Sequence, residues 1–187
     1  MAYQILGFQY LAPSEYDTYD HWRNFALTHG VDVDYSYGNQ CYDLIALLYF
    51  QYGRTFYLGG QGYAYEAWTV SQTRNSQPPF VAVERNQIKR GDVVVFGTAF
   101  SVYGHVAMAD EDYNGGNYIW LVGQNQGQGI SWGTPSNRWH CPYAYNLMGG
   151  FRNTNWQTTP PPTPVEDEEK KKGFPWVLYS RKLRGQN

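Results

Sequence analysis

The amino-acid sequence predicts an α+β fold, and two observations carry this prediction. Helix-like patterns are confined to the first part of the chain, up to about residue 71, whereas short apolar runs typical of strands fill the second part. Such a separation of helices from strands is characteristic of α+β domains, because alternating elements would instead indicate a parallel sheet. The 187 residues are enough for one domain with a substantial core.

Composition narrows the classes of function. The formal net charge is −2, without a basic excess, so nucleic acid is not an expected partner. Aromatic residues make up 18% of the chain, including 18 Tyr and 7 Trp, and such side chains suit carbohydrate or peptide ligands where they do not simply fill the core. The two cysteines, Cys41 and Cys141, are too few for a disulfide framework and too far apart for a C-x-x-C zinc motif.

Neither a membrane span nor an export signal is predicted. No run of about 18 apolar residues is present, so we expect no transmembrane helix. The first residues, MAYQILG, lack the basic start and the long apolar run of a signal peptide. We therefore expect synthesis in the cytoplasm of the producing cell.

Residues 14–30 predict the first helix. Ser14 provides a cap, acidic residues follow in the first turn, and Gly30 provides a stop. Tyr19, Trp22 and Ala26 fall on one side and predict the buried face.

Residues 31–38 predict a turn-rich loop that contains Asp32 and Asp34, and Asp43 follows within the next helix. Hard cations bind several oxygen ligands, and two aspartates separated by one residue present two carboxylates. The spacing does not match an EF-hand. Aspartates in turns commonly bind only their own backbone, so the residues alone leave both interpretations open.

Residues 39–53 predict a buried helix around which the remaining elements are arranged. Asn39 can cap its start, and Gly53 can end it in the left-handed conformation. Cys41 lies in the first turn and begins an apolar stripe, where the helix dipole favours a thiolate. A lone buried cysteine is more commonly inert, so a catalytic role requires a partner elsewhere in the chain.

The second half predicts a sheet. The expected elements are a short helix at residues 64–71 and strands at 80–83, 93–96, 104–109 and 118–122, then a loop-rich segment at 128–146 and a closing strand at 149–152. His105 lies at the start of one strand, and Asn125 follows the end of the next.

Beyond Trp156 the pattern of a globular domain ends. We expect a catalytic domain over residues 1–157 and a Pro-rich, charged linker over 158–172. Residues 173–187 are expected to be a C-terminal extension or the start of a further module.

A helix-borne cysteine, a strand-borne histidine and an amide, in this order, form the layout of papain-like hydrolases. The sequence resembles the CHAP domain, a cysteine- and histidine-dependent amidohydrolase/peptidase found in phage endolysins and bacterial autolysins. The motifs that carry the resemblance are QCYDL at residues 40–44, GDVVVF at 91–96, GHVA at 104–107 and QN at 124–125.

The resemblance implies a papain-like α+β fold with helices packed on a central antiparallel sheet. By position, Cys41 would be the nucleophile, His105 the base and Asn125 the group that orients the base. Many relatives carry an acidic residue two positions before this asparagine, and Gly123 is a departure from that pattern. Gln40 and the Cys41 backbone N–H would form the oxyanion hole.

The resemblance also strengthens the interpretation of the acidic loop, because some phage relatives bind calcium before the cysteine. Asp32, Asp34 and Asp43 match the acidic ligand positions, and backbone oxygens near Ser36 and Gly38 would complete the shell. Simple turn-forming aspartates remain the alternative.

The expected function is therefore hydrolysis of an amide bond in peptidoglycan, either as an endopeptidase or as an N-acetylmuramoyl-L-alanine amidase. We expect a monomeric phage endolysin that is made in the host cytoplasm and reaches the wall after a holin opens the membrane. The alternatives are a papain-like protease or transglutaminase acting on protein, a tail-associated wall hydrolase, and a catalytically silent wall-binding module.

Overall fold

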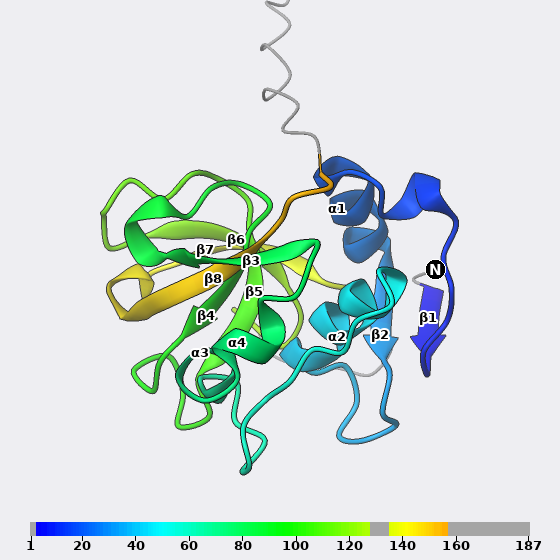
Figure 1. The fold of residues 1–187 in the computed structure, drawn as a ribbon, viewed down its shortest axis with the longest axis horizontal. Helices are drawn as coiled ribbons and strands as arrows, with labels where there is room; N and C mark the ends of the chain where they lie inside the picture. The colour runs from blue at the N-terminus through cyan, green and yellow to red at the C-terminus, as the bar shows by residue number, and fades with distance from the viewer. Residues whose placement is uncertain (1–2, 128–134, 157–187) are drawn as a thin grey trace, which may run out of the picture. The chain divides into compact units, whose positions relative to one another are not determined.

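The computed structural model describes residues 3–127 and 135–156 (Figure 1). The helices are α1 (Tyr19–Thr28), α2 (Cys41–Gln51), α3 (Glu66–Thr69) and α4 (Gln72–Asn75), with 3-10 turns at Pro13–Glu15, Arg85–Gln87 and Ala144–Asn146. The strands are β1 (Tyr3–Leu6), β2 (His29–Asp32), β3 (Phe80–Glu84), β4 (Val93–Phe96), β5 (His105–Ala109), β6 (Ile119–Gly123), β7 (Asn137–Cys141) and β8 (Leu147–Asn153). The expected linker and C-terminal extension lie outside the described residues.

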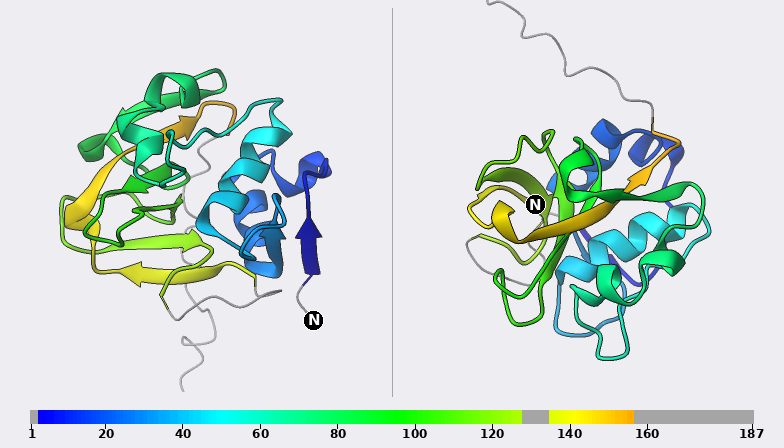
Figure 2. Two further views of the ribbon diagram at one scale, coloured as in Figure 1. Left: turned by 90° about the horizontal axis from the view of Figure 1, so that it is seen from below. Right: turned by 60° about the vertical axis from the view of Figure 1, so that its left-hand side comes forward.

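Six of these strands form one sheet in the order β3-β8-β4-β5-β6-β7, and all neighbouring pairs are antiparallel. β1 and β2 form a separate parallel pair beyond the helices (Figure 2). This arrangement confirms the predicted α+β fold with an antiparallel sheet. In the described part of the chain, no helix has the length and apolar character needed to cross a bilayer.

An apolar core fills the space between the sheet and the helices α1 and α2. In α2, the side chains from Leu44 to Tyr49 are all buried, so the helix is enclosed on nearly every side. The apolar stripe predicted from the sequence was therefore too narrow, because Ala46 and Leu47 lie outside it and are buried as well. That stripe consisted of Cys41, Leu44, Ile45, Leu48 and Tyr52.

A second apolar core covers the opposite face of the sheet. Along β4, Val93 and Val95 contribute to the core under the helices, while Val94 and Phe96 contribute to the second one. The continuous apolar run of this strand follows from burial on both faces.

The first helix begins later than predicted. Thr18 is its cap, and the Thr18 hydroxyl accepts a hydrogen bond from the His21 backbone at 3.1 Å. The predicted cap, Ser14, instead belongs to a separate 3-10 turn. Gly30 is a strand residue of β2 that pairs with Gln4, because the N-terminal segment supplies β1 as a partner.

The start of α2 depends on an aspartate in its first turn. Gln40, not Asn39, is the N-cap residue, and its backbone N–H donates to Asp43 Oδ2 at 2.7 Å. At the other end, Gly53 adopts a φ of 65° and donates to the Phe50 carbonyl at 2.9 Å, as predicted for the helix stop.

The strands predicted around residues 80–83, 93–96, 104–109 and 118–122 are confirmed. The predicted helix at 64–71 is replaced by two short helices, α3 and α4, the second of which starts at Gln72. The segment expected to be loop-rich contains β7, and β8 lies between β3 and β4 rather than at an edge of the sheet.

Candidate active site

The ends of three secondary-structure elements meet where the predicted catalytic residues lie. Cys41 is the first residue of α2, His105 is the first residue of β5, and α2 packs against β5. The end of β6 joins them through Gln124, whose Nε2 donates to the Gln40 carbonyl at 2.8 Å and to the Val31 carbonyl at 2.9 Å. The amide of Gln124 therefore holds the start of α2 against the sheet.

The thiol of Cys41 lies beside the backbone of β5. Burial raises its pKa to about 11, although a hydrogen bond from the Val106 backbone N–H opposes the shift. The sequence predicted a lowered pKa from the helix dipole, and that prediction is wrong for the ligand-free chain. Loss of hydration disfavours the thiolate more than the helix start stabilises it.

His105 is almost completely enclosed. Its exposed fraction is 2%, and its ring stacks on Phe100 with centroids 4.2 Å apart and planes inclined by 3°. Burial lowers the pKa of the ring to about 4, while a hydrogen bond with Gln126 opposes the shift. At neutral pH the imidazole is therefore uncharged and able to accept a proton.

The hydrogen-bond partner of His105 is Gln126, at 3.0 Å from Nε2 to Oε1. The predicted orienting residue, Asn125, has an exposed side chain and a left-handed backbone with a φ of 53°. The structure thus brings Gln126, and not Asn125, to the ring. Sequence reasoning missed Gln126 because residues 124–126 are three consecutive amides, and the local turn decides which of them faces the histidine.

Gln40, the predicted oxyanion-hole residue, lies at the expected place before Cys41. Its side-chain Nε2 donates to the Ser36 carbonyl at 2.8 Å. The amide nitrogen carries a second hydrogen, so a role toward the substrate oxygen stays a prediction.

The three predicted acidic ligands come together. Asp32, Asp34 and Asp43 each offer an oxygen, and these oxygens lie within 4.8 Å of one another. Burial raises the pKa of Asp43 to about 7, and the negative charges of Asp34 and Asp32 act in the same direction, whereas backbone hydrogen bonds from Gln40 and Val33 oppose them. Ionising all three carboxylates in this space is therefore unfavourable without a cation.

The residues present fit a hard cation. Both carboxylate oxygens of Asp32 are buried and have no hydrogen-bond partner within the described structure. Such orphaned oxygens are costly unless a ligand satisfies them. Ser36 lies in the same loop, but its carbonyl already accepts the hydrogen bond from Gln40. Gly38 is buried with a φ of 72°, and a ligand role for its backbone oxygen stays a prediction.

A cysteine at a helix start, a histidine at the start of an adjoining strand and an amide on the histidine ring define the papain-like class of cysteine hydrolases. Comparison with known proteins agrees. The CHAP domain model matches residues 30–125, more than half of the 187-residue chain, and the chain belongs to the CHAP domain family. The family resemblance predicted from the sequence motifs is thereby confirmed.

Two relatives show how far the similarity extends. The chain is 36% identical over 114 residues to the D-alanyl-L-alanine endopeptidase of Streptococcus phage B30, a match that covers 59% of this chain and 25% of that protein. The crystal structure of the endolysin LysIME-EF1 matches with a TM-score of 0.57 and 25% identity, over 75% of this chain and 66% of that one. The chain thus spans a quarter of the first relative and slightly less than two thirds of the second.

Proposed function

We propose that the chain is a cysteine-dependent hydrolase that cleaves an amide bond of bacterial peptidoglycan. The observation that carries the proposal is the packing of α2 against β5, because Cys41 is the first residue of α2 and His105 is the first residue of β5. Membership of the CHAP family and similarity to an endopeptidase of Streptococcus phage B30 and to an endolysin support peptidoglycan as the substrate.

The geometry suits proton transfer between two neutral groups. Cys41 gives its thiol proton to His105 as the sulfur attacks the carbonyl carbon of the substrate. The protonated His105 then gives this proton to the departing amine, the C–N bond breaks, and a thioester remains on Cys41. Water, deprotonated by His105, attacks the thioester, which releases a carboxylic acid and restores the thiol.

The relative from Streptococcus phage B30 is a D-alanyl-L-alanine endopeptidase, and this activity favours a peptide bond over the N-acetylmuramoyl-L-alanine amide bond. A phage endolysin that acts on the cell wall is the role we propose, and a tail-associated hydrolase is the alternative. Mass spectrometry of digested peptidoglycan identifies the newly formed amine and therefore the bond. New D-alanine carboxyl ends paired with L-alanine amines support an endopeptidase, whereas free muramoyl groups support an amidase.

Replacement of the candidate catalytic pair tests the reaction class. Cys41→Ala and His105→Ala should each abolish clearing of cell walls in zymograms, while circular dichroism stays unchanged. Cys141→Ser is the matched control, because Cys141 is buried at the end of β7 and, among the described residues, its sulfur accepts a hydrogen bond only from the Tyr143 N–H at 3.4 Å. Full activity of Cys41→Ala would refute the proposal. If the wild-type protein cleaved casein but not cell walls, a papain-like protease acting on protein would be favoured.

We also propose that Asp32, Asp34 and Asp43 bind one calcium ion. The orphaned oxygens of Asp32 and the raised pKa of Asp43 support the proposal, and oxygen-only ligands in an irregular loop suit calcium better than zinc. When bound, the ion would supply positive charge that relieves repulsion among the carboxylates. Asp43 also accepts the Gln40 N–H, so the same residue links the cation site to the start of α2.

A further inference from the structure

We propose that Gln126 is the positioning residue for the His105 base, and that Gly123 is required because it leaves the space that the Gln126 side chain occupies. The proposal rests on the catalytic role proposed above for His105. Neither residue has an acidic or basic side chain. Together they determine which nitrogen of His105 acts as the base.

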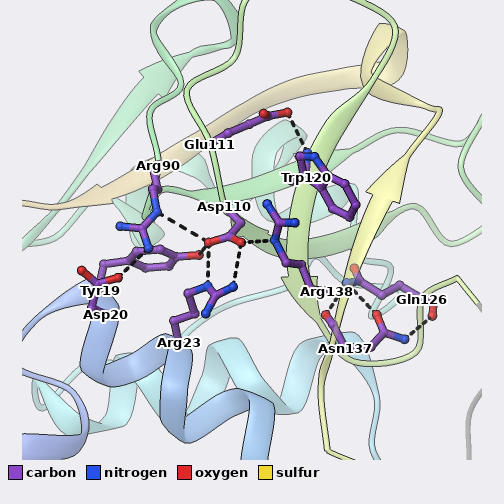
Figure 3. A network of polar contacts seen from close by, with 10 residues as sticks. All are labelled: Tyr19, Asp20, Arg23, Arg90, Asp110, Glu111, Trp120, Gln126, Asn137 and Arg138. Carbon is purple, nitrogen blue, oxygen red and sulfur yellow. Dashed lines mark hydrogen bonds and ion pairs between the residues drawn. The ribbon is translucent and has the colours of Figure 1, made fainter. Parts of the chain in front are cut away.

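Gln126 is held rigidly at the ring. Its exposed fraction is 3%, and its Oε1 lies 3.0 Å from His105 Nε2. Its Nε2 lies 3.1 Å from the Asn137 carbonyl and 3.2 Å from Asn137 Oδ1. Asn137 Nδ2 donates in return to the Gln126 carbonyl at 2.9 Å. Asn137, the first residue of β7, therefore fixes both the side chain and the backbone of Gln126 (Figure 3).

These contacts determine the tautomer of His105. A backbone carbonyl can only accept a hydrogen bond, so the Gln126 atom that faces the Asn137 carbonyl must be the amide nitrogen. The other atom, which faces His105, is then the amide oxygen, and it can only accept. Nε2 of His105 must carry the hydrogen, and in the neutral imidazole Nδ1 is left as the free base. This nitrogen is the one available to take the Cys41 proton.

Gly123 makes the arrangement possible. A Cβ at position 123 would lie 2.9 Å from Gln126 Oε1 and 3.0 Å from the Cβ of Ala107, closer than such contacts ordinarily permit. After Gly123 the chain leaves β6, turns through the left-handed Asn125, and returns the side chain of Gln126 toward the ring. The backbone of Gly123 itself lies outside the left-handed region, so an alanine there would act through its volume and not through backbone strain.

The test uses three single variants of the full chain and one double variant, which combines Gly123→Ala with Gln126→Met. Gln126→Met keeps the length of the side chain but removes the acceptor. Gly123→Ala places a methyl group in the space that the Gln126 amide occupies. Asn125→Gly is the control on an exposed neighbour, because glycine keeps the left-handed turn and removes only the side chain. Two quantities are measured, the turnover of purified walls and the His105 tautomer from imidazole 15N chemical shifts without substrate. Thermal melting verifies that each variant is folded.

We expect the wild type and Asn125→Gly to show the Nε2–H tautomer and equal turnover. Gln126→Met should give a tautomer mixture and lose turnover on the order of a hundredfold, the effect of a misplaced catalytic group. Gly123→Ala should lower turnover as well, but it should add no further loss in a Gln126→Met background, because both changes remove the same contact.

Unchanged tautomer and turnover in Gln126→Met would overturn the proposal, as would a loss confined to Asn125→Gly. Additive losses in the double variant would overturn the part that concerns Gly123. If Gln126→Met does not fold, Gly123→Ala answers the same question. The NMR measurement needs no catalysis, so it separates this proposal from the proposed function: an active Cys41→Ala protein would refute the function and leave the tautomer result standing.

Discussion

Burial acts in opposite directions on the two ionisable side chains that meet at the starts of α2 and β5. It raises the pKa of the Cys41 thiol to about 11 and lowers the pKa of the His105 imidazole to about 4. Between these values we expect both groups to be neutral, so that the ligand-free site holds a thiol and an imidazole and not an ion pair. The nucleophile is then generated only as the substrate carbonyl is attacked.

Two pH dependences follow at the scale of these residues. Alkylation of Cys41 by iodoacetamide needs the thiolate, so its rate should be low at pH 7 and should keep rising above pH 9. A Cys41 alkylation rate that already reaches its plateau below pH 7 would instead demonstrate a thiolate–imidazolium pair.

His105 must be unprotonated to act as a base, so kcat/KM should persist as the pH falls and decline only near pH 4.

The identity of the site residues was only partly predictable from the sequence. Cys41 and His105 were predicted from the family motifs QCYDL and GHVA, and the structure places each at the start of its element. The amide on His105 could not be predicted, because Asn125 and Gln126 differ little in chemistry and the turn at Asn125 decides between them. The pKa direction of Cys41 was missed because it depends on how deeply α2 is enclosed, which no local pattern reveals.

At the scale of elements, the start of α2 is fixed from three sides. Gln124 binds the Gln40 carbonyl, Asp43 accepts the Gln40 N–H, and the Gln40 side chain binds Ser36 in the preceding loop. The loop and the helix start are thus one hydrogen-bonded unit, and any change in the acidic cluster reaches Cys41 through Gln40.

The calcium proposal predicts a stability effect with a definite dependence on pH. The folded-state pKa of Asp43, about 7, is raised above the usual value of an aspartate. The ion-free folded chain therefore gains stability from this proton below about pH 4, and it loses that stability as the pH rises through 7. Calcium requires the ionised carboxylate, so the melting temperature in calcium minus that in EDTA should be small at pH 5 and largest above pH 7.

Matched variants complete this test. Asp34→Ala should abolish the calcium response, because Asp34 is the exposed member of the cluster and the α2 cap formed by Asp43 stays intact. Glu84→Ala, which removes an exposed acid on β3, should retain the response. The cation site is refuted if calorimetry detects no calcium binding and EDTA leaves the melting temperature unchanged, and the three aspartates then serve only as turn and cap residues.

The elements differ in how well the sequence predicts them. The strands β4, β5 and β6 have continuous apolar runs because both faces of the sheet are covered, and these were predicted. β7, whose residues are Asn-Arg-Trp-His-Cys, is an edge strand with four residues exposed or partly exposed, so it lacks an apolar pattern. The interior position of β8 depends on the close approach of Gly150 to the Val93 carbonyl, a contact between distant parts of the chain.

At the scale of the whole described molecule, one buried carboxylate links the helical layer to the sheet. Asp110, just after β5, accepts hydrogen bonds from Arg23 Nε of α1 at 2.8 Å, from the Tyr19 hydroxyl at 2.9 Å and from Arg138 Nε of β7 at 2.5 Å. Arg90 lies 3.6 Å away and also pairs with Asp20 (Figure 3). Burial alone would raise the pKa of Asp110, but the hydrogen bonds from Arg23, Arg138 and Tyr19 lower it.

Removal of this carboxylate should loosen α1 from the sheet without altering the chemistry of the site. Asp110→Ala leaves the Tyr19 hydroxyl and three guanidinium groups without their common acceptor. Loss of one partner from a fully buried ion pair costs about 3–5 kcal/mol. The side chains of Arg23, Arg90 and Arg138 are 25%, 24% and 39% exposed, so water can solvate them in part. We therefore expect a loss of roughly 2–3 kcal/mol in the free energy of unfolding, measured by urea denaturation.

Asp112→Ala is the matched control, because Asp112 lies two residues away and accepts only the Arg90 backbone N–H at 2.9 Å among the hydrogen bonds of the described residues. It should change the unfolding free energy by less than about 1 kcal/mol. Below its melting transition, Asp110→Ala should clear walls at the wild-type rate, since its contacts lie at the end of β5 opposite His105. A wild-type unfolding midpoint in Asp110→Ala would mean that the apolar core alone holds α1 on the sheet and that the cluster of charges contributes no net stability.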